Sequence, residues 1–245
     1  MKTTRFNPTA NGRLHLGHLY LILVNYHTAK STGGKFIVRF DDDQSYWIKN
    51  IGIEKIEEYC QLIKEDLEWM GIVPDLYSYE SKEKKENESY LRGMRGIDPD
   101  IGDGNPDSAH FAHYEHLHIK SIDRPYPYVP YLTAIKVVQD CREGCNTIIR
   151  GEDLLSEYSL YCHFCTLLDI PIPALYFLPK LMQQKNNVIT DLSDVSKTAG
   201  NFKIADCRND GYTPQDIVEM LAKSCLINME DGWKYDNIKQ RPTIG

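Results

Sequence analysis

The sequence predicts an α/β fold built on a parallel sheet, and two patterns lead to this prediction. The first forty residues alternate in type: a short strand at 5–6, an apolar helical stretch over 14–33 and a near-continuous apolar strand at 35–40. Apolar residues then recur at three- and four-residue steps as far as Gly71 and predict an amphipathic helix, at Ile53, Ile56, Cys60, Ile63, Leu67 and Met70. Strand, helix, strand and helix in this order are typical of parallel strands joined by covering helices.

Composition favours a compact protein and excludes several other classes. The 245 residues include 42% hydrophobic, 11% aromatic and 26% charged residues, which is close to the globular average. The 28 Lys and Arg against 35 Asp and Glu give a net charge of −7, which argues against a broad surface for nucleic-acid phosphates but leaves room for a small one.

Nothing in the sequence predicts export or membrane insertion. No charged start followed by an apolar core is visible at the N-terminus, and no run approaches the eighteen or so apolar residues of a membrane span. The seven cysteines are therefore expected to be reduced thiols in a cytoplasmic protein.

Changes in composition divide the chain into four expected parts. Residues 1–77 are expected to form the first half of the α/β domain, and 78–125 an insertion that is first charged and then rich in Gly, Asp and Pro. Residues 126–190 form the second half, with strands at 129–138 and 145–151, a helix over 154–168 and a strand or turn at 175–182. Residues 191–245 hold a polar loop, two short helices near residues 206 and 214–225, and a tail.

The first candidate site is a pair of histidines, His15 and His18, at the start of the first predicted helix. Their spacing of three places both on one face of the first turn. A helix start binds anions through its unpaired N–H groups and its dipole, two imidazoles add further donors, and Gly17 would allow close approach of a purine. Two histidines alone could equally be core or surface residues.

Four segments together resemble the ordered motifs of class I aminoacyl-tRNA synthetases, in the glutamyl/glutaminyl subfamily. They are RFNPTANGRLHLGH (5–18), FIVRFDDD (36–43), NTIIRGEDLL (146–155) and DVSKTAGN (194–201). The resemblance extends over about residues 3–225 with a gap at the insertion, and motifs in the right order are more specific than any one alone. It implies a Rossmann-like synthetase core with a reduced insertion and a short helical C-terminal region.

On the ATP side, the resemblance implies that His15, His18 and Lys197 are catalytic. Gly17 becomes the adenine contact, and the remaining ATP-binding positions are Ser196, Lys197, Gly151 and Glu152. Cations and N–H donors suit this role, since charge grows on the phosphate oxygens when a carboxylate attacks the α-phosphorus. The implied cofactors are ATP and Mg²⁺. The family usually has a lysine at position 194, so Asp194 is expected to remove one phosphate contact.

On the amino-acid side, the resemblance implies a pocket for glutamate. It places Arg5, Thr9, Asp41 and Arg150 at pocket positions, with Asp41 for the ammonium group and Arg150 for the side-chain carboxylate. A guanidinium binds a carboxylate by two hydrogen bonds that an amide cannot reproduce. The pocket tyrosine falls at Tyr131 or Leu132, with Lys136 nearby, and a surface salt bridge remains the alternative for Arg150.

The size resembles that of truncated family members such as the glutamyl-queuosine tRNA(Asp) synthetases. Only 48 residues follow Lys197, so no anticodon recognition is expected. Truncated members commonly carry a cysteine-rich zinc site in the insertion, whereas residues 78–125 contain no cysteine. The reduced insertion leaves transfer to tRNA open.

Two further patterns suggest metal sites but favour other interpretations. Cys141, Cys145, Cys162 and Cys165 have a spacing that zinc allows, yet they fall at a turn and inside an amphipathic helix, where thiols serve as small apolar groups. The histidine-rich segment 110–118 contributes His110, His113, His116 and His118 and is more typical of a solvated or substrate-facing loop. Zinc is therefore not expected.

Taken together, the sequence predicts an ATP-dependent ligase that activates an amino acid, with glutamate favoured, as an aminoacyl-adenylate. The expected acceptor is the end or a modified base of a tRNA. The alternatives are a tRNA-independent ligase or adenylyltransferase that acts on a small molecule, peptide or carrier protein, and a non-catalytic relative. Three separated phosphate-facing groups, His15, His18 and Lys197, argue against the last of these.

Overall fold

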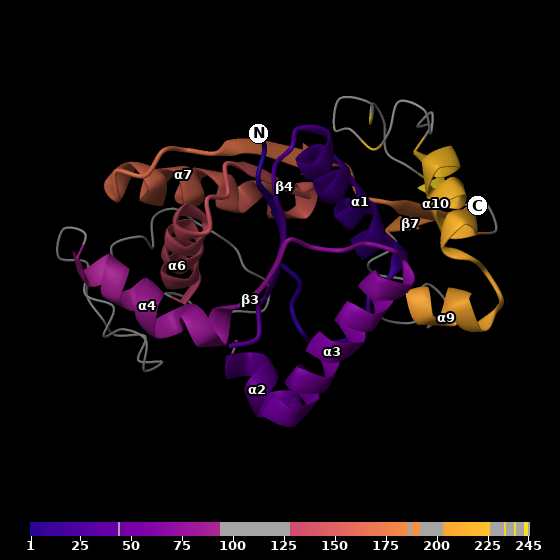
Figure 1. The fold of residues 1–245 in the computed structure, drawn as a ribbon, viewed down its shortest axis with the longest axis horizontal. Helices are drawn as coiled ribbons and strands as arrows, with labels where there is room; N and C mark the ends of the chain where they lie inside the picture. The colour runs from indigo at the N-terminus through magenta and orange to yellow at the C-terminus, as the bar shows by residue number, and fades with distance from the viewer. Residues whose placement is uncertain are drawn as a thin grey trace. The chain divides into compact units, whose positions relative to one another are not determined.

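The computed structural model describes residues 1–43, 45–93, 128–185, 188–191, 203–225, 233, 238 and 243–244. These residues belong to two compact units. The first contains Met1–Ser81, Thr147–Glu152 and Leu175–Gly245, and the second contains Lys82–Asn146 and Asp153–Ala174. Each unit is described by itself (Figure 1).

The first unit is built on a parallel sheet, as the sequence predicts. Strands β1 (Thr4–Phe6), β2 (Phe36–Phe40) and β3 (Leu76–Tyr79) lie in that order, with both neighbouring pairs parallel. All five residues of β2 are buried, which explains its continuous apolar sequence. Strand β4 (Thr147–Gly151) pairs with β5 (Ala174–Leu178) and begins beside β1, where the Thr147 N–H donates to the Thr3 carbonyl over 3.2 Å.

Helix α1 (Leu16–Ser31) connects β1 to β2 and contacts both strands as well as β4. Asn25, in the middle of this buried helix, donates from Nδ2 to the Ile149 carbonyl of β4, while the Thr4 hydroxyl of β1 donates to the Asn25 carbonyl. Two polar contacts therefore fix the helix to two strands. Gly34 precedes β2, and a Cβ there would lie 2.0 Å from the Lys2 carbonyl oxygen, so only glycine fits.

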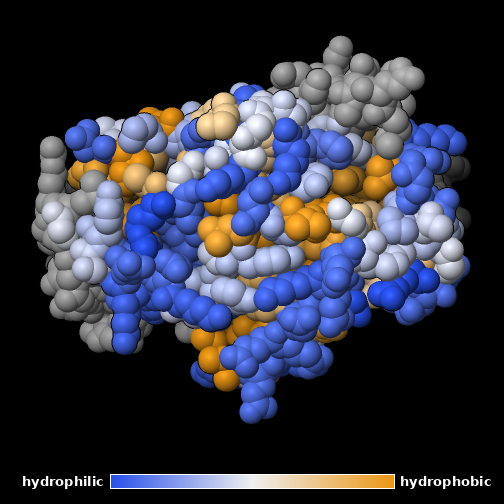
Figure 2. Space-filling model, in the orientation of Figure 1, coloured by the Kyte–Doolittle hydropathy of each residue, from blue (hydrophilic) through white to orange (hydrophobic). Residues whose placement is uncertain are grey.

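The predicted amphipathic helix is present as α3 (Ile53–Trp69), after a short α2 (Ser45–Ile51). It begins after Gly52 and ends before Gly71, both with positive φ. Its buried face holds Ile56, Cys60, Ile63 and Leu67, together with one acid, Asp66. The surface over this helix is largely hydrophilic in Figure 2, in agreement with the charged outer positions of its sequence.

The C-terminal part of the first unit adds a small sheet and two helices. Strands β6 (Met182–Lys185), β7 (Val188–Asp191) and β8 (Thr243–Ile244) lie in the order β7-β6-β8. The two predicted short helices are confirmed as α9 (Ile204–Asn209) and α10 (Pro214–Ser224). Thr213 caps α10 by accepting from the Asp216 N–H, while the Asp216 carboxylate accepts from the Thr213 N–H.

The second unit is helical. It contains most of α4 (Glu80–Gly93), then α6 (Tyr128–Arg142), a 3₁₀ helix (Glu152–Glu157) and α7 (Tyr158–Leu167). The Tyr161 hydroxyl of α7 donates to the buried Asp140 carboxylate of α6 over 2.8 Å, which joins the two helices.

One secondary-structure prediction in this unit is wrong. Residues 129–138, expected as a strand, lie within the α6 helix. The helix is buried on several sides, so its sequence lacks the regularly spaced polar residues of an amphipathic helix. Its buried apolar residues include Leu132, Ala134, Ile135, Val137 and Val138. A short apolar run rich in β-branched residues cannot be assigned by periodicity alone.

Within the described residues, no helix combines the length and the apolar character that crossing a membrane requires.

Candidate functional site

The start of α1 is closed by its two histidines. His15 is the N-cap, and its Nδ1 accepts hydrogen bonds from the backbone N–H groups of Gly17 at 3.1 Å and His18 at 3.3 Å. In return, His18 Nδ1 accepts from the His15 N–H at 3.4 Å. The two rings stack with centroids 3.6 Å apart. Imidazoles here take the reciprocal capping role that serine and glutamate have at other helix starts.

This arrangement fixes the proton on each ring. Because each Nδ1 accepts from a backbone N–H, the neutral ring carries its proton on Nε2, which makes Nε2 a donor. Burial, and secondarily the neighbouring His15, lowers the pKa of His18 to about 3. At neutral pH, His18 is therefore an uncharged hydrogen-bond donor, suited to a phosphate oxygen rather than to proton transfer.

Gly17 has a structural role in this cap. A Cβ at position 17 would meet His15 Cε1 at 3.0 Å and Nδ1 at 3.1 Å, which is tighter than ordinary contact. Glycine therefore leaves the space that the His15 ring occupies. The adenine contact expected for Gly17 remains a proposal.

The chain just after the DVSK segment lies beside this helix start. Lys203 forms an isolated antiparallel bridge with His15, and the Ile204 N–H donates to the Leu14 carbonyl over 3.0 Å. Asp194, Ser196 and Lys197 lie outside the described residues. Five residues separate Lys197 from Lys203, so the two Cα atoms are at most about 20 Å apart when the chain is extended.

A second group of side chains lies where β2 ends. Asp41 is buried, pairs with Thr9 in a parallel bridge, and its Oδ2 lies 3.5 Å from the Thr9 hydroxyl. Its backbone N–H donates to the Pro8 carbonyl over 3.0 Å. The structure thus brings together two of the predicted pocket residues, Thr9 and Asp41.

Two more acids, missed by the sequence reasoning, join Asp41. One carboxylate oxygen from each of Asp41, Asp43 and Glu80 lies within 4.8 Å of the others. Asn7 donates from Nδ2 both to Glu80 Oε1 at 3.0 Å and to the Arg39 carbonyl. Glu80 directly follows β3, which is the parallel neighbour of β2. Because the carboxyl ends of parallel strands meet at one edge of the sheet, this position after a strand was the signal that could have predicted Glu80 beside Asp41.

The other predicted pocket positions are distributed over both units. Arg5 is buried in β1, and Arg150 is half-buried in β4, one residue before Gly151 ends that strand. Glu152 follows, and its Oε1 accepts from the Lys180 N–H over 3.2 Å. All of these residues are in the first unit, whereas Tyr131 is in the first turn of α6 in the second unit, with a side chain outside the described set.

The cysteine pattern lies in the second unit and at its edges. Cys145 and Cys165 are buried, Cys162 is half-buried and Cys141 is exposed. Burial, with smaller contributions from neighbouring acidic groups, raises the pKa of the Cys165 thiol to about 12, as expected of a thiol that packs as an apolar group. Among the residues that the structure describes, the sole metal-compatible group of three or more is the acidic one at Asp41. The histidines of 110–118 lie outside the described residues.

Comparison with known proteins finds a family that the N-terminal part of this chain resembles. Residues 2–94, which contain both histidines and Asp41, match a family model described as the catalytic domain of class I tRNA synthetases (E and Q). This stretch, which is less than half of the chain, is similar to that domain, and the resemblance seen in the sequence is confirmed for it.

Curated relatives share sequence with part of this chain. A glutamate–tRNA ligase 2 of Ruegeria sp. (strain TM1040) is 43% identical over 82 residues, or 34% of this chain and 17% of the relative. One from Erythrobacter litoralis (strain HTCC2594) is 36% identical over 95 residues, or 39% of this chain and 20% of the relative. The matched stretches therefore span about a fifth or less of these curated relatives.

Solved structures extend the fold match to the whole chain. The crystal structure of a glutamate tRNA ligase from Elizabethkingia meningosepticum CCUG26117, in complex with its amino acid, has a TM-score of 0.69 at 20% identity, covering 100% of this chain and 67% of that one. A tyrosyl-tRNA synthetase from Archaeoglobus fulgidus, complexed with L-tyrosine, has a TM-score of 0.54 at 14% identity, covering 73% and 55%. These likenesses confirm the expected Rossmann-like α/β fold, and at this identity they show the fold alone.

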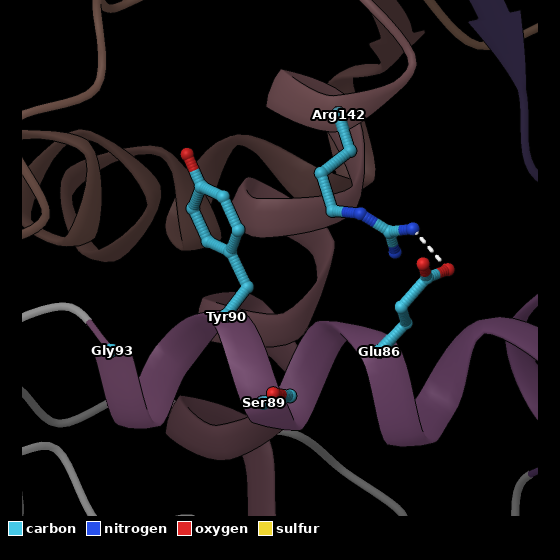
Figure 3. Close-up of a pocket in the computed structure, with 5 residues that line it drawn as sticks. All are labelled: Glu86, Ser89, Tyr90, Gly93 and Arg142. Carbon is cyan, nitrogen blue, oxygen red and sulfur yellow. Dashed lines mark hydrogen bonds and ion pairs between the residues drawn. The ribbon is translucent and has the colours of Figure 1, made fainter.

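A separate cavity lies in the second, helical unit. It has a volume of about 530 Å³ and is lined by Glu86, Ser89, Tyr90, Gly93 and Arg142. Figure 3 shows Arg142 reaching from α6 toward Glu86 of α4, with which it forms an ion pair. Arg142 also lies 3.2 Å from Glu83, so its charge is already matched by acids on α4. None of the residues that line this cavity is a predicted site residue.

Proposed function

We propose that this chain activates glutamate with ATP, forming glutamyl-adenylate and pyrophosphate. The observation that carries the proposal is the bridge between His15 and Lys203. It supports placing the lysine-bearing segment and the histidine-capped helix start at one nucleotide, because Lys197 precedes the bridge by six residues. Convergence of these two segments is the central requirement of the adenylation mechanism.

On the ATP side, the chain stabilises charge. The glutamate carboxylate forms a bond to the α-phosphorus, the bond to the bridging oxygen of the β-phosphate breaks, and pyrophosphate leaves with the electron pair. The Nε2–H groups of His15 and His18 donate to phosphate oxygens, and the Lys197 ammonium pairs with the β- and γ-phosphates. Fixed donors stabilise such developing charge without reorganising. With Asp194 in place of a lysine, one cationic contact is lost.

On the amino-acid side, the chain binds and orients. Asp41 pairs with the substrate ammonium, beside Thr9, and the neighbouring carboxylates of Asp43 and Glu80 make this position favourable for a cation. Arg150 pairs with the side-chain carboxylate and thereby selects glutamate over glutamine.

Mg²⁺ fits this chemistry as the partner of the triphosphate. Carboxylate oxygens are ligands that Mg²⁺ prefers, and it usually keeps substrate phosphates and water in its coordination shell. The acidic group formed by Asp41, Asp43 and Glu80 is the described set that could contribute such an oxygen. When bound, the ion would neutralise charge on the phosphates.

The proposed acceptor is tRNA. A hydroxyl or amine of the acceptor attacks the acyl carbon, and AMP leaves. The glutamate–tRNA ligases among the relatives support this acceptor over a small molecule, a peptide or a carrier protein. Transfer to the end of the tRNA and transfer to a modified base remain the two forms of the proposal.

ATP–pyrophosphate exchange tests the activation step. We expect exchange with glutamate, and not with glutamine or tyrosine, measured with and without total tRNA. A second assay with radiolabelled glutamate then measures acid-precipitable glutamyl-tRNA. If none of the twenty amino acids supports exchange in the presence of tRNA, the adenylation proposal is wrong. If glutamate supports exchange but no labelled glutamyl-tRNA forms, only the proposed acceptor is rejected.

A further inference from the structure

Asp66 is a buried acid on the inner face of α3 that contacts the loop leading to the histidines. Its side chain is 3% exposed, and Arg13 Nη2 lies 2.6 Å from Asp66 Oδ1. Arg13 Nε donates to Oδ2 at 3.4 Å, so the guanidinium binds both carboxylate oxygens. Asp66 Oδ2 also accepts the backbone N–H of Leu14 at 3.2 Å.

The peptide units on both sides of Leu14 are therefore held. The Leu14 N–H donates to Asp66, and its carbonyl accepts from the Ile204 N–H at 3.0 Å. The Leu14 side chain is fully buried. The next residue is His15, whose backbone angles of −117° and 171° place its ring over the helix start. A change in the Leu14 peptide would thus move the His15 ring directly.

Helix α3 also contacts α9, which follows the lysine-bearing segment. The Arg208 guanidinium of α9 lies 5.8 Å from the ring centroid of Trp69, three residues after Asp66 on α3. One helix therefore contacts both the loop before His15 and the helix after the DVSK segment. A rigid element shared by two segments can keep them in a constant relative position.

We propose that Asp66 is a positioning residue for the His15–His18 pair, acting through the Leu14 N–H. The proposal rests on the adenylation function above, since the pair matters for catalysis only if it binds the triphosphate. Asp66 itself contacts no reacting atom. It fixes the peptide from which His15 caps the helix, and misplacement of a phosphate donor by about 1 Å is enough to cost on the order of 10²-fold in rate.

Asp75 provides a matched control. It too accepts one backbone N–H, from Phe36 at 2.7 Å, and one cation, Lys30 at 2.8 Å. It lies just before β3, beside the first residue of β2 rather than the last. The variants Asp66→Asn and Asp75→Asn therefore remove the same kind of charge. In Asp66→Asn, one of the two oxygens becomes an NH2 group that cannot accept from Arg13 or Leu14, so only this variant weakens the contact with the loop before His15.

The kinetic test measures ATP–pyrophosphate exchange with glutamate in both variants. We expect Asp66→Asn to lower kcat about 10- to 100-fold with a change in the KM for ATP below about threefold, and Asp75→Asn to change neither by more than about twofold. In a His15→Ala background, Asp66→Asn should cost less than about twofold more, since its target is gone. Multiplicative losses in the double variant would overturn the proposal.

Arg13→Gln separates the backbone contact from the ion pair and serves if Asp66→Asn fails to fold. It leaves the Leu14 hydrogen bond in place, so we expect exchange within about fivefold of the parent chain. If Arg13→Gln loses as much exchange activity as Asp66→Asn, the Leu14 contact is not the one that positions His15. Where Asp66→Asn does not fold, a loss of about 10-fold or more in Arg13→Gln leads to the same conclusion.

Amide hydrogen exchange tests the positioning without any enzymatic activity. Asp66→Asn should speed exchange at the Leu14, Gly17 and His18 amides by at least about 10-fold relative to Asp75→Asn, because the cap loosens. Equal protection in both variants would overturn the positioning role. If the amides exchange faster in Asp66→Asn but the parent chain shows no ATP–pyrophosphate exchange, the proposed function is rejected. The contact from Asp66 to the loop before His15 would still hold the helix cap in place.

Discussion

The two ends of strand β2 use aspartate in different ways. At the amino end, Asp75 accepts the Phe36 N–H and pairs with Lys30, and the hydrogen bond from Lys30 lowers the pKa of the Asp75 carboxyl. At the carboxyl end, Asp41 comes together with Asp43 and Glu80, three acids in one place. One acid pairs with one lysine at the first end, whereas three acids at the second end are close enough to face one cation.

The difference separates stabilising residues from binding residues. A one-to-one pair at the surface contributes a little to folding and does nothing further. A group of like charges is costly unless a cation joins it, which is the situation that a substrate ammonium creates. Substitutions near the carboxyl end should therefore change activity more than stability, and those at the amino end the reverse.

The largest expected effect is at the helix start that lies next to the carboxyl end. His18→Ala removes one fixed phosphate donor and should lower ATP–pyrophosphate exchange by more than about 10²-fold. The midpoint of urea unfolding should change little by comparison. Exchange within about threefold of the parent chain would contradict the role of the pair.

The next largest effect is expected for Arg150→Gln at the end of β4. Loss of the guanidinium removes a bidentate contact to the side-chain carboxylate, so kcat/KM for glutamate should fall by about 10²-fold. The kcat/KM for glutamine should fall less, so the preference for glutamate over glutamine becomes smaller. Parallel losses for both amino acids would place Arg150 outside the specificity pocket.

Acid titration of stability gives a smaller effect that still belongs to the histidine end. His18 has a pKa of about 3 in the folded chain against about 6.5 unfolded, so the unfolded chain binds the extra proton between these values. The free energy of unfolding should fall as pH drops from about 6.5 toward 3. His18→Asn, which keeps an acceptor for the His15 N–H, should flatten that slope. An unchanged slope would mean that His18 titrates normally.

The smallest effect is expected at the amino end. Asp75→Asn should reduce the free energy of unfolding at pH 7 by about 1 kcal/mol or less, because the pair is partly exposed. The carboxyl has a lowered pKa in the folded chain, so its contribution is present above about pH 4 and is lost as pH falls through that lowered pKa. The parent chain and Asp75→Asn should therefore have the same free energy of unfolding in strong acid. A difference that persists there would have another origin.

The sequence was most informative where pattern and chemistry coincide. Apolar positions at helical spacing gave α1 and α3, a continuous apolar run gave β2, and the resemblance selected His15, His18 and Asp41 from motifs of fixed spacing. It failed for α6, since a helix buried on several sides has no polar face to reveal its period. It also missed Glu80, whose partners are brought together only by the pairing of β2 with β3.

Asp66 shows a further limit of sequence reasoning. A polar residue on the apolar face of α3 interrupts the pattern, but its partners Arg13 and Leu14 are more than fifty positions away. Only the packed structure shows that this interruption serves the loop before His15. Interruptions of a good amphipathic pattern are therefore worth comparing with loops that carry functional residues.

The neutral histidine cap also determines how nucleotide binding exchanges protons with the solvent. Since burial holds the pKa of His18 well below neutral pH, a phosphate bound at its Nε2–H should not draw a proton from the buffer. The heat of nucleotide binding measured by calorimetry should then be the same in buffers of high and low ionisation enthalpy, apart from the titration of the nucleotide itself.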